Sequence, residues 1–396
     1  MRLVLYTGKG GVGKTTTAAA TAVCAAERGR RTLVVSADAA HSLGDVFERR
    51  LGPSPSEILP GLDASEIDPR VEMLHHWGRI RDYLVEMFHY QGIEDVVAEE
   101  LAQLPGSEEI TTLLAVEKLA ASGRYDFLIV DCAPTDSALR LATLPEVAHR
   151  ALRLLLPTLQ AITRVGTPVA QKVVAMPLPR SVVFRDAEAL IYDKLKILHK
   201  RITDPQTSVR IVVTPERMVI EEARRAYTEL ALFEVPCDAV VMNRLLPEEA
   251  AREAFFQHWS RLQDERCREV DELFAPLPLL RAPLHADQVT GCERLGELGR
   301  QLFAQLEPDA VLSESAQVHF GRDDAGYFAQ IPLPNASADD LDVAVVDDDL
   351  IITAGARWRC LSLPRRLARR SVRSAKLDAG RLTVKFGAIA SAEADA

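Results

Sequence analysis

Short apolar runs alternate with longer helical patterns along the first part of the chain. Each run is rich in aliphatic and β-branched residues, as strands buried on both faces of a parallel sheet are. The runs cover residues 3–6, 31–36, 126–131, 209–213 and 239–242. We therefore predict an α/β fold with a doubly wound parallel sheet, whose ligands bind at the carboxyl ends of the strands.

Two long helical patterns, at residues 66–122 and 145–204, are too large to be ordinary connections between strands. They predict helical insertions in the α/β domain. Their apolar residues recur at helical spacing, as Met73, Trp77 and Leu84 do in the first pattern. Such a stripe usually packs in a core, and an exposed groove for an apolar ligand is the alternative interpretation.

After about residue 310 the pattern changes to short alternating segments separated by turns, which predicts a small β-sandwich. The segments cover residues 326–333, 341–346, 349–354, 357–363 and 381–386. We divide the chain into an α/β domain (residues 1–306), a linker (307–320), the β-sandwich (321–389) and a frayed tail (390–396).

The composition fits a globular protein, because 47% of the 396 residues are hydrophobic and 26% are charged. A net charge of -10 argues against non-specific binding of nucleic acid, which needs a basic surface. No apolar run reaches the roughly 18 residues of a membrane span. The first apolar run leads directly into a glycine-rich turn, which leaves no room for a signal peptide. We expect a cytoplasmic protein without a transmembrane segment.

The glycine-rich turn reads Gly8-Lys9-Gly10-Gly11-Val12-Gly13-Lys14-Thr15, followed by Thr16. Its glycines also fit the dinucleotide fingerprint, and Asp38 lies near the position of a ribose-binding acid. A dehydrogenase, however, has no use for Lys14 and Thr15 at these positions. In a phosphate loop the amides cradle phosphates, the lysine neutralises the β- and γ-oxygens, and the hydroxyl ligates Mg²⁺. The turn therefore predicts an ATPase that binds ATP and Mg²⁺ through residues 8–16, with Lys14 catalytic.

Lys9 adds a positive charge that ordinary phosphate loops do not require. The loop thereby resembles the deviant phosphate loop of the family that contains the arsenite-pump ATPase and the tail-anchored-protein targeting ATPase. This resemblance, which covers roughly residues 1–305, implies a homodimer. It also implies that Lys9 crosses the dimer interface and acts catalytically, by stabilising the charge on the phosphoryl group transferred in the neighbouring subunit.

Four further segments match this family in order. Residues 36–43 look like its switch I, which implies that Asp38 positions the attacking water. Residues 131–135 look like its switch II, which implies that Asp131 holds Mg²⁺ through water. Residues 105–109 resemble an element near the nucleotide and the dimer interface. Residues 241–247, with the loop at 214–216, resemble the adenine site and imply that Asn243 and Pro215 contact the base.

The sequence also departs from the family pattern. Ala39 replaces a proline of switch I, and Asp136-Ser137-Ala138 replaces the usual G-H-T after switch II. After the Asn243 strand there is only Cys267 where the targeting ATPases of animals and fungi carry C-x-x-C, so we expect no zinc. The chain has one ATPase half and no recognisable cysteine trio, which gives arsenite binding little support. We expect its cysteines to be buried hydrophobic residues: Cys24, Cys132, Cys237, Cys267, Cys292 and Cys360.

Residues 349–355, 359–364 and 376–384 resemble the α-crystallin domain of small heat-shock proteins, which implies binding to exposed apolar or edge-strand protein surfaces. A basic cluster lies in the same region, and we interpret it as a solvated face, with an anionic partner as the alternative. The cluster consists of Arg357, Arg359, Arg365, Arg366, Arg369, Arg370 and Arg373.

The leading functional hypothesis is an ATP-driven dimeric switch that binds apolar protein segments, such as a tail anchor, and works with a hydrophobic protein client or a membrane-protein partner. The alternative is the ATPase subunit of an arsenite or anion efflux system. A regulatory or assembly ATPase is a third possibility.

Overall fold

The computed structural model describes residues 1–38, 42–68, 107–132, 195–314, 316–324, 326–346, 348–355 and 357–389, with positions 82, 85, 89 and 94. Its chain forms two compact units. The first unit comprises residues 1–7, 13–207 and 287–310, and the second comprises residues 8–12, 208–286 and 311–396. The apolar stripes predicted in the helical insertions, residues 39–41, 105–106 and 133–138, and the predicted tail lie outside the described residues.

Five strands of the first unit lie in the order β3-β4-β2-β5-β1. They are β1 (Arg2–Thr7), β2 (Thr32–Ser36), β3 (Ser56–Leu59), β4 (Leu62–Glu66) and β5 (Phe127–Asp131). All pairings are parallel except that of β3 with β4. Every residue of β1, β2 and β5 is buried, which explains their apolar sequences.

The helices of the first unit include α1 (Lys14–Glu27) and α13 (Gly291–Phe303), which pack against each other. A Cβ atom on Gly299 would lie 2.4 Å from the carbonyl oxygen of Ala20, so the two backbones approach closely at this point. The short α2 (Leu43–Phe47) also contacts α1. Farther along the chain, α5 (Ser107–Ala121) and α9 (Leu195–Ile202) are joined by an ion pair between Glu117 and Arg201, 2.7 Å long.

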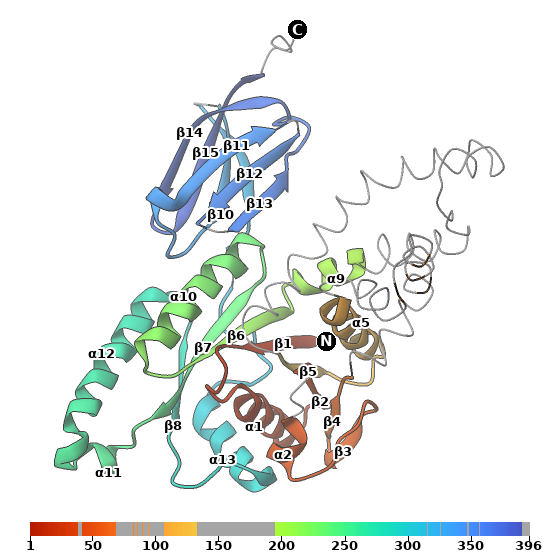
Figure 1. Ribbon diagram of the computed structural model, residues 1–396, viewed down its shortest axis with the longest axis vertical. Helices are drawn as coiled ribbons and strands as arrows, with labels where there is room; N and C mark the ends of the chain where they lie inside the picture. Colours follow the sequence, from red (N-terminus) through yellow and green to blue (C-terminus); the bar gives the residue numbers. More distant parts are fainter. Residues whose placement is uncertain are drawn as a thin grey trace. The chain divides into compact units, whose positions relative to one another are not determined.

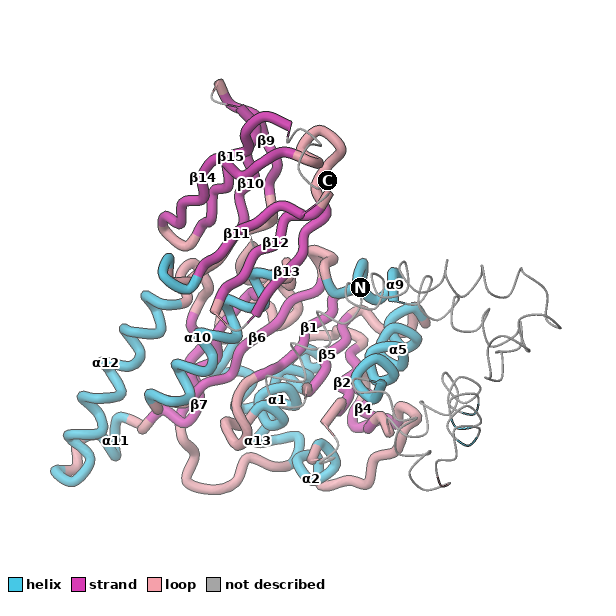
Figure 2. The backbone as a smooth tube through the Cα atoms, turned by 45° about the horizontal axis from the view of Figure 1, so that its top comes forward, coloured by secondary structure: helices cyan, strands magenta, loops and turns pink. Residues whose placement is uncertain are grey.

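The second unit contains three parallel strands, β6 (Thr207–Val213), β7 (Cys237–Leu245) and β8 (Leu279–Pro283). Its helical segments are α10 (Arg217–Leu232), α11 (Glu248–Ala251), η2 (Ala254–Phe256) and α12 (Gln257–Leu273). Helices α10 and α12 lie side by side (Figures 1 and 2). A fully buried ion pair joins neighbouring strands, because Arg210 on β6 donates to Asp238 on β7 at 3.1 and 3.2 Å.

The carboxy-terminal part of the second unit is all-β. One sheet has the order β14-β15-β10-β9 and the other the order β11-β12-β13 (Figure 2). The strands are β9 (His319–Asp323), β10 (Gly326–Pro332), β11 (Leu341–Val346), β12 (Asp349–Ala354), β13 (Arg357–Ser362), β14 (Arg370–Asp378) and β15 (Arg381–Ile389). A short 3-10 turn, η3 (Ala338–Asp340), precedes β11.

The predicted fold class, an α/β sheet followed by an all-β part, is confirmed, with one correction to the sheet. The large sheet is mixed rather than purely parallel, because β3 runs antiparallel to β4.

The interpretation of the basic cluster as a solvated face is wrong for Arg359, whose side chain is only 2% exposed. Its guanidinium donates to the carbonyl oxygen of Leu232 and, at 2.7 Å, to Glu234, so this arginine is buried with a partner instead of solvated.

Candidate phosphate-binding site

The glycine-rich turn connects β1 to α1 through backbone conformations that favour glycine. Gly13 caps α1 at a φ of 94°, in the left-handed region. Gly8 has a φ of 147°, and a Cβ atom added to it would lie 2.3 Å from the carbonyl oxygen of Val212. Gly10 and Gly11 are exposed, and Lys9 is half-buried. A strand, an open loop and a helix N-terminus in succession form an arrangement that can bind phosphate.

Four polar residues of the first unit share one electrostatic environment. Lys14 is buried at the start of α1, and the hydroxyl groups of Thr15 and Ser42 lie 3.0 Å apart. Asp131 ends β5 with no exposed surface. Burial raises the pKa of the Asp131 carboxyl to about 6, whereas Thr15 and Lys14 lower it and the charge of Asp38 raises it further. Lys14, Thr15 and Asp38 therefore all act on the Asp131 carboxyl.

The Asp131 carboxylate fits a role in binding Mg²⁺. Both of its oxygens are buried, and neither accepts a hydrogen bond of ordinary length from the described residues. A buried carboxylate without such partners is costly unless a cation or water satisfies it. Carboxylate and hydroxyl oxygens are the ligands that Mg²⁺ takes in phosphate sites, often through water. Asp131 and Thr15 are thus suitable residues to hold the ion.

Asp38 lies two residues beyond the end of β2 and is half-buried. Its backbone carbonyl accepts a hydrogen bond from the Ser36 hydroxyl at 3.4 Å. Asp38 therefore follows the carboxyl end of β2, at the edge where a parallel sheet binds ligands, and its charge raises the pKa of Asp131 at the end of β5. Thr16, by contrast, is a half-buried residue in the first turn of α1, and no hydrogen bond among the described residues joins it to these carboxylates.

In the second unit, Asn243 supports the glycine-rich turn. Its side-chain nitrogen donates to the carbonyl oxygen of Val12 at 2.8 Å, and its side-chain oxygen accepts from the amide of Arg244 at 2.9 Å. Asn243 is 8% exposed. From the sequence we predict that Asn243 contacts the base. The sequence gives no local signal for its hydrogen bond to the loop, because 231 residues separate the two partners.

A cavity of about 340 Å³ opens beside these residues in the second unit. Its walls include Pro215, Arg244 and Leu284, which lie at or just after the carboxyl ends of β6, β7 and β8. Three aromatic residues also line it: Phe256, and the more exposed Phe255 and Trp259, which are 79% and 62% exposed. Sequence reasoning did not single out Phe255 and Trp259, although such exposure of large rings is a signal of binding.

All six cysteines lie in the described part of the chain, and none forms a disulfide. Cys24, Cys132, Cys237 and Cys267 are buried. Burial raises the pKa of each of these four thiols, and that of Cys292 as well. Among the described residues, no three His, Cys, Asp or Glu side chains cluster as a metal site. No described helix combines the length and apolarity that crossing a membrane requires.

Comparison with known proteins places these features in context. The profile of the family described as "Anion-transporting ATPase" matches residues 1–304, and that of the "HSP20-like domain found in ArsA" matches residues 324–386. The chain is 33% identical to "Putative arsenical pump-driving ATPase 1" of Aquifex aeolicus, over 96% of this chain and 98% of that protein. It is 32% identical to "Putative arsenical pump-driving ATPase" of Chlorobaculum tepidum, over 92% and 90% of the two chains. It is 26% identical to "Putative arsenical pump-driving ATPase 2" of Aquifex aeolicus, over 76% of this chain and 99% of that protein.

Proposed function

The chain belongs to the anion-transporting ATPase family, and on that premise we propose that it is a homodimeric Mg-ATP-driven switch that binds apolar protein segments. One observation carries the proposal: the HSP20-like part lies in the same compact unit as residues 8–12 of the phosphate loop and as Asn243. A change in the loop on ATP binding or hydrolysis can therefore reach a module related to protein-binding chaperones.

Polar contacts fasten the β-sandwich to the α/β part of that unit. On β13, Arg359 binds Leu232 and Glu234 at the end of α10, and Arg357 forms an ion pair with Glu229. The Thr228 hydroxyl donates to the carbonyl oxygen of Pro334 at 2.6 Å. Because these contacts start from several residues of one helix, α10 can transmit a displacement to the β-sandwich instead of letting it swing freely.

The residues of the site have distinct roles in the proposed hydrolysis. Lys14 neutralises the phosphate oxygens, and Lys9 of the partner subunit supplies a second positive charge to the transferring group. Asp38 orients the attacking water. Thr15 and Asp131 would hold Mg²⁺, which supplies charge neutralisation on the phosphates when bound. The cavity with Phe255 and Trp259 takes the adenine ring, since aromatic side chains stack on bases.

Energising the efflux of arsenite or another anion is the second candidate function, and the names of the two Aquifex relatives favour it. The arrangement of the cysteines disfavours it, because a metalloid site needs several thiols close together, and the residues that the structure describes contain no cluster of three His, Cys, Asp or Glu side chains that could hold a metal ion. We therefore favour an apolar protein segment over a metalloid as the ligand of this ATPase.

The ATPase rate distinguishes the two functions. We expect a hydrophobic helical peptide to change the rate of hydrolysis, whereas arsenite or antimonite should leave it unchanged, because the described cysteines do not form a cluster that could bind a metalloid. A peptide of equal length with polar residues in place of the apolar ones is the control. Stimulation by metalloid alone would overturn the proposed client, and so would a rate that responds to neither addition.

The dimeric role of Lys9 can be tested by mixing two inactive variants. Asp38→Asn should retain ATP binding but slow hydrolysis by about 10²-fold, because the water is no longer oriented. If Lys9 acts in the partner's site, a heterodimer of Lys9→Ala and Asp38→Asn subunits contains one site with both residues. Roughly half of the wild-type rate per heterodimer should then return. A mixture that forms heterodimers yet stays inactive would show that Lys9 does not act across the interface.

A further inference from the structure

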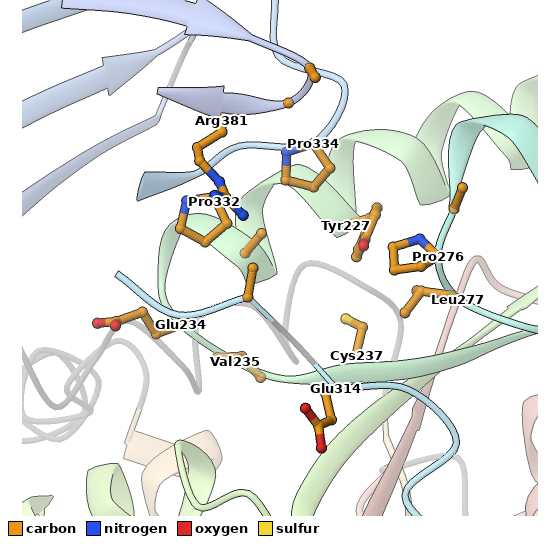
Figure 3. Close-up of a pocket in the computed structure, with 15 residues that line it drawn as sticks. Tyr227, Glu234, Val235, Cys237, Pro276, Leu277, Glu314, Pro332, Pro334 and Arg381 are labelled. Atoms are coloured by element: carbon orange, nitrogen blue, oxygen red, sulfur yellow. The ribbon is translucent and has the colours of Figure 1, made fainter. Parts of the chain in front are cut away.

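A second cavity, of about 260 Å³, lies within the second unit (Figure 3). One side is formed by Tyr227 of α10 and Cys237 at the start of β7. Pro276 and Leu277 line it from the turn before β8, and Pro332 and Arg381 line it from the β-sandwich. Apolar rings and aliphatic groups share the walls with polar groups in about equal measure. The cavity lies at the first residue of β7, six residues from Asn243 at the other end of that strand, so it is separate from the phosphate loop.

Arg381 gives this cavity a positive charge. Its side chain extends from the start of β15 toward the space between Pro332 and Tyr227 (Figure 3). No other described residue forms a hydrogen bond or ion pair with its guanidinium. Two carboxylates also line the cavity but do not neutralise Arg381. Glu234 is bound to Arg359 at 2.7 Å and accepts the Val318 amide at 3.2 Å, while the carboxylate of Glu314 extends away from Arg381 in Figure 3.

Tyr227 supplies a second polar group. Its ring packs 5.5 Å from that of Phe274, centroid to centroid, which orients the side chain. Its hydroxyl has no partner among the residues that the structure describes. Burial, with a smaller contribution from Cys237, raises the pKa of Tyr227, so the hydroxyl stays protonated and can donate a hydrogen bond. A guanidinium and a hydroxyl donor thus line a cavity whose apolar walls include Pro276, Leu277 and Pro332.

We propose that this cavity is a binding site for a small carboxylate with an apolar body. A guanidinium binds a carboxylate through two parallel hydrogen bonds, and the Tyr227 hydroxyl can donate to the same group. The apolar body would then lie against Pro276, Leu277 and Pro332. Ligand cavities commonly measure about 300–1,000 Å³, so this smaller cavity favours a compact ligand of about the size of phenylpropionate.

Titration calorimetry with 3-phenylpropionate, on the full chain without nucleotide, tests the site. We expect a dissociation constant on the order of 1 mM or tighter. The uncharged 3-phenylpropanamide should bind at least about tenfold more weakly, because it lacks the ionic contact. Arg381→Gln should weaken phenylpropionate binding by at least about tenfold, and Tyr227→Phe by about threefold.

Arg373→Gln is the matched control, because Arg373 is an exposed arginine of the neighbouring strand β14 and does not line the cavity. This variant should bind phenylpropionate as the wild type does. Thermal unfolding of each variant identifies any that fails to fold, and Arg381→Lys then replaces such an Arg381 variant with a weaker, non-bidentate contact. Undetectable binding at about 10 mM, equal affinity for the amide, or equal losses in the Arg381 and Arg373 variants would each overturn the proposal.

Discussion

Replacing Lys14 with alanine is expected to lower the rate of ATP hydrolysis by at least about 10³-fold, because a buried positive charge at the phosphates stabilises the transferring group. Lys14 is 7% exposed and lies close enough to Asp131 to lower the pKa of that carboxyl. Its removal also leaves the Asp131 carboxylate without a nearby compensating charge. Steady-state phosphate release and fluorescent-nucleotide binding measure the two consequences separately.

Lys196→Ala is the control for this substitution, since Lys196 is an exposed lysine of α9. It should hydrolyse ATP at the wild-type rate. The melting temperatures of both variants, measured without nucleotide, show whether either loses its fold. A folded Lys14→Ala protein that hydrolyses ATP within tenfold of the wild-type rate would refute the assigned role of the phosphate loop.

The second large effect is expected on stability, from the ion pair between Arg210 and Asp238. Both side chains are fully buried, and Asp238 also accepts the amide of Leu312 at 3.3 Å. Replacing Arg210 with methionine leaves a buried carboxylate without its charged partner, which costs about 3–5 kcal/mol of unfolding free energy. The double variant Arg210→Met/Asp238→Leu removes both charges and should recover much of that loss.

Urea denaturation monitored by circular dichroism gives the comparison. Arg281→Met is the control, because Arg281 pairs with Asp271 at 2.9 Å while both side chains are about half exposed. Loss of that exposed pair should cost at most about 1 kcal/mol. If Arg210→Met is as mild as Arg281→Met, the buried pair does not stabilise the second unit in the way its burial implies.

The sequence predicts well those strands whose apolar residues form a continuous or alternating pattern. β1, β2 and β5 are buried at every position, and so each is an apolar run that stands out locally. The sequence does not predict β14, because six of its nine residues, Arg370–Asp378, are exposed and four are charged. Its strand conformation depends on pairing with β15, and a sequence pattern does not report such a tertiary interaction.

The same distinction applies to the candidate site. The sequence alone identifies the phosphate loop, because Lys14 and Thr15 lie next to the glycines that shape the turn. The sequence does not predict the hydrogen bond by which Asn243 supports this loop, because the acceptor carbonyl belongs to Val12, far away in the sequence. Arg359 was misjudged for a related reason. One arginine within a basic cluster looks like its neighbours, and only the fold reveals that it lies 5.9 Å above the ring of Phe233 with Glu234 as its partner.

The burial of Arg359 also constrains how the gene can change. The residues that it binds, Leu232 and Glu234, lie 127 and 125 positions earlier in the chain. Loss of the β-sandwich would remove Arg359, the ion-pair partner of Glu234. Replacement of Glu234 by a neutral residue would remove the carboxylate that binds the buried Arg359 guanidinium. Both changes are unfavourable alone, so substitutions at the two positions should accumulate together in descendants of this protein.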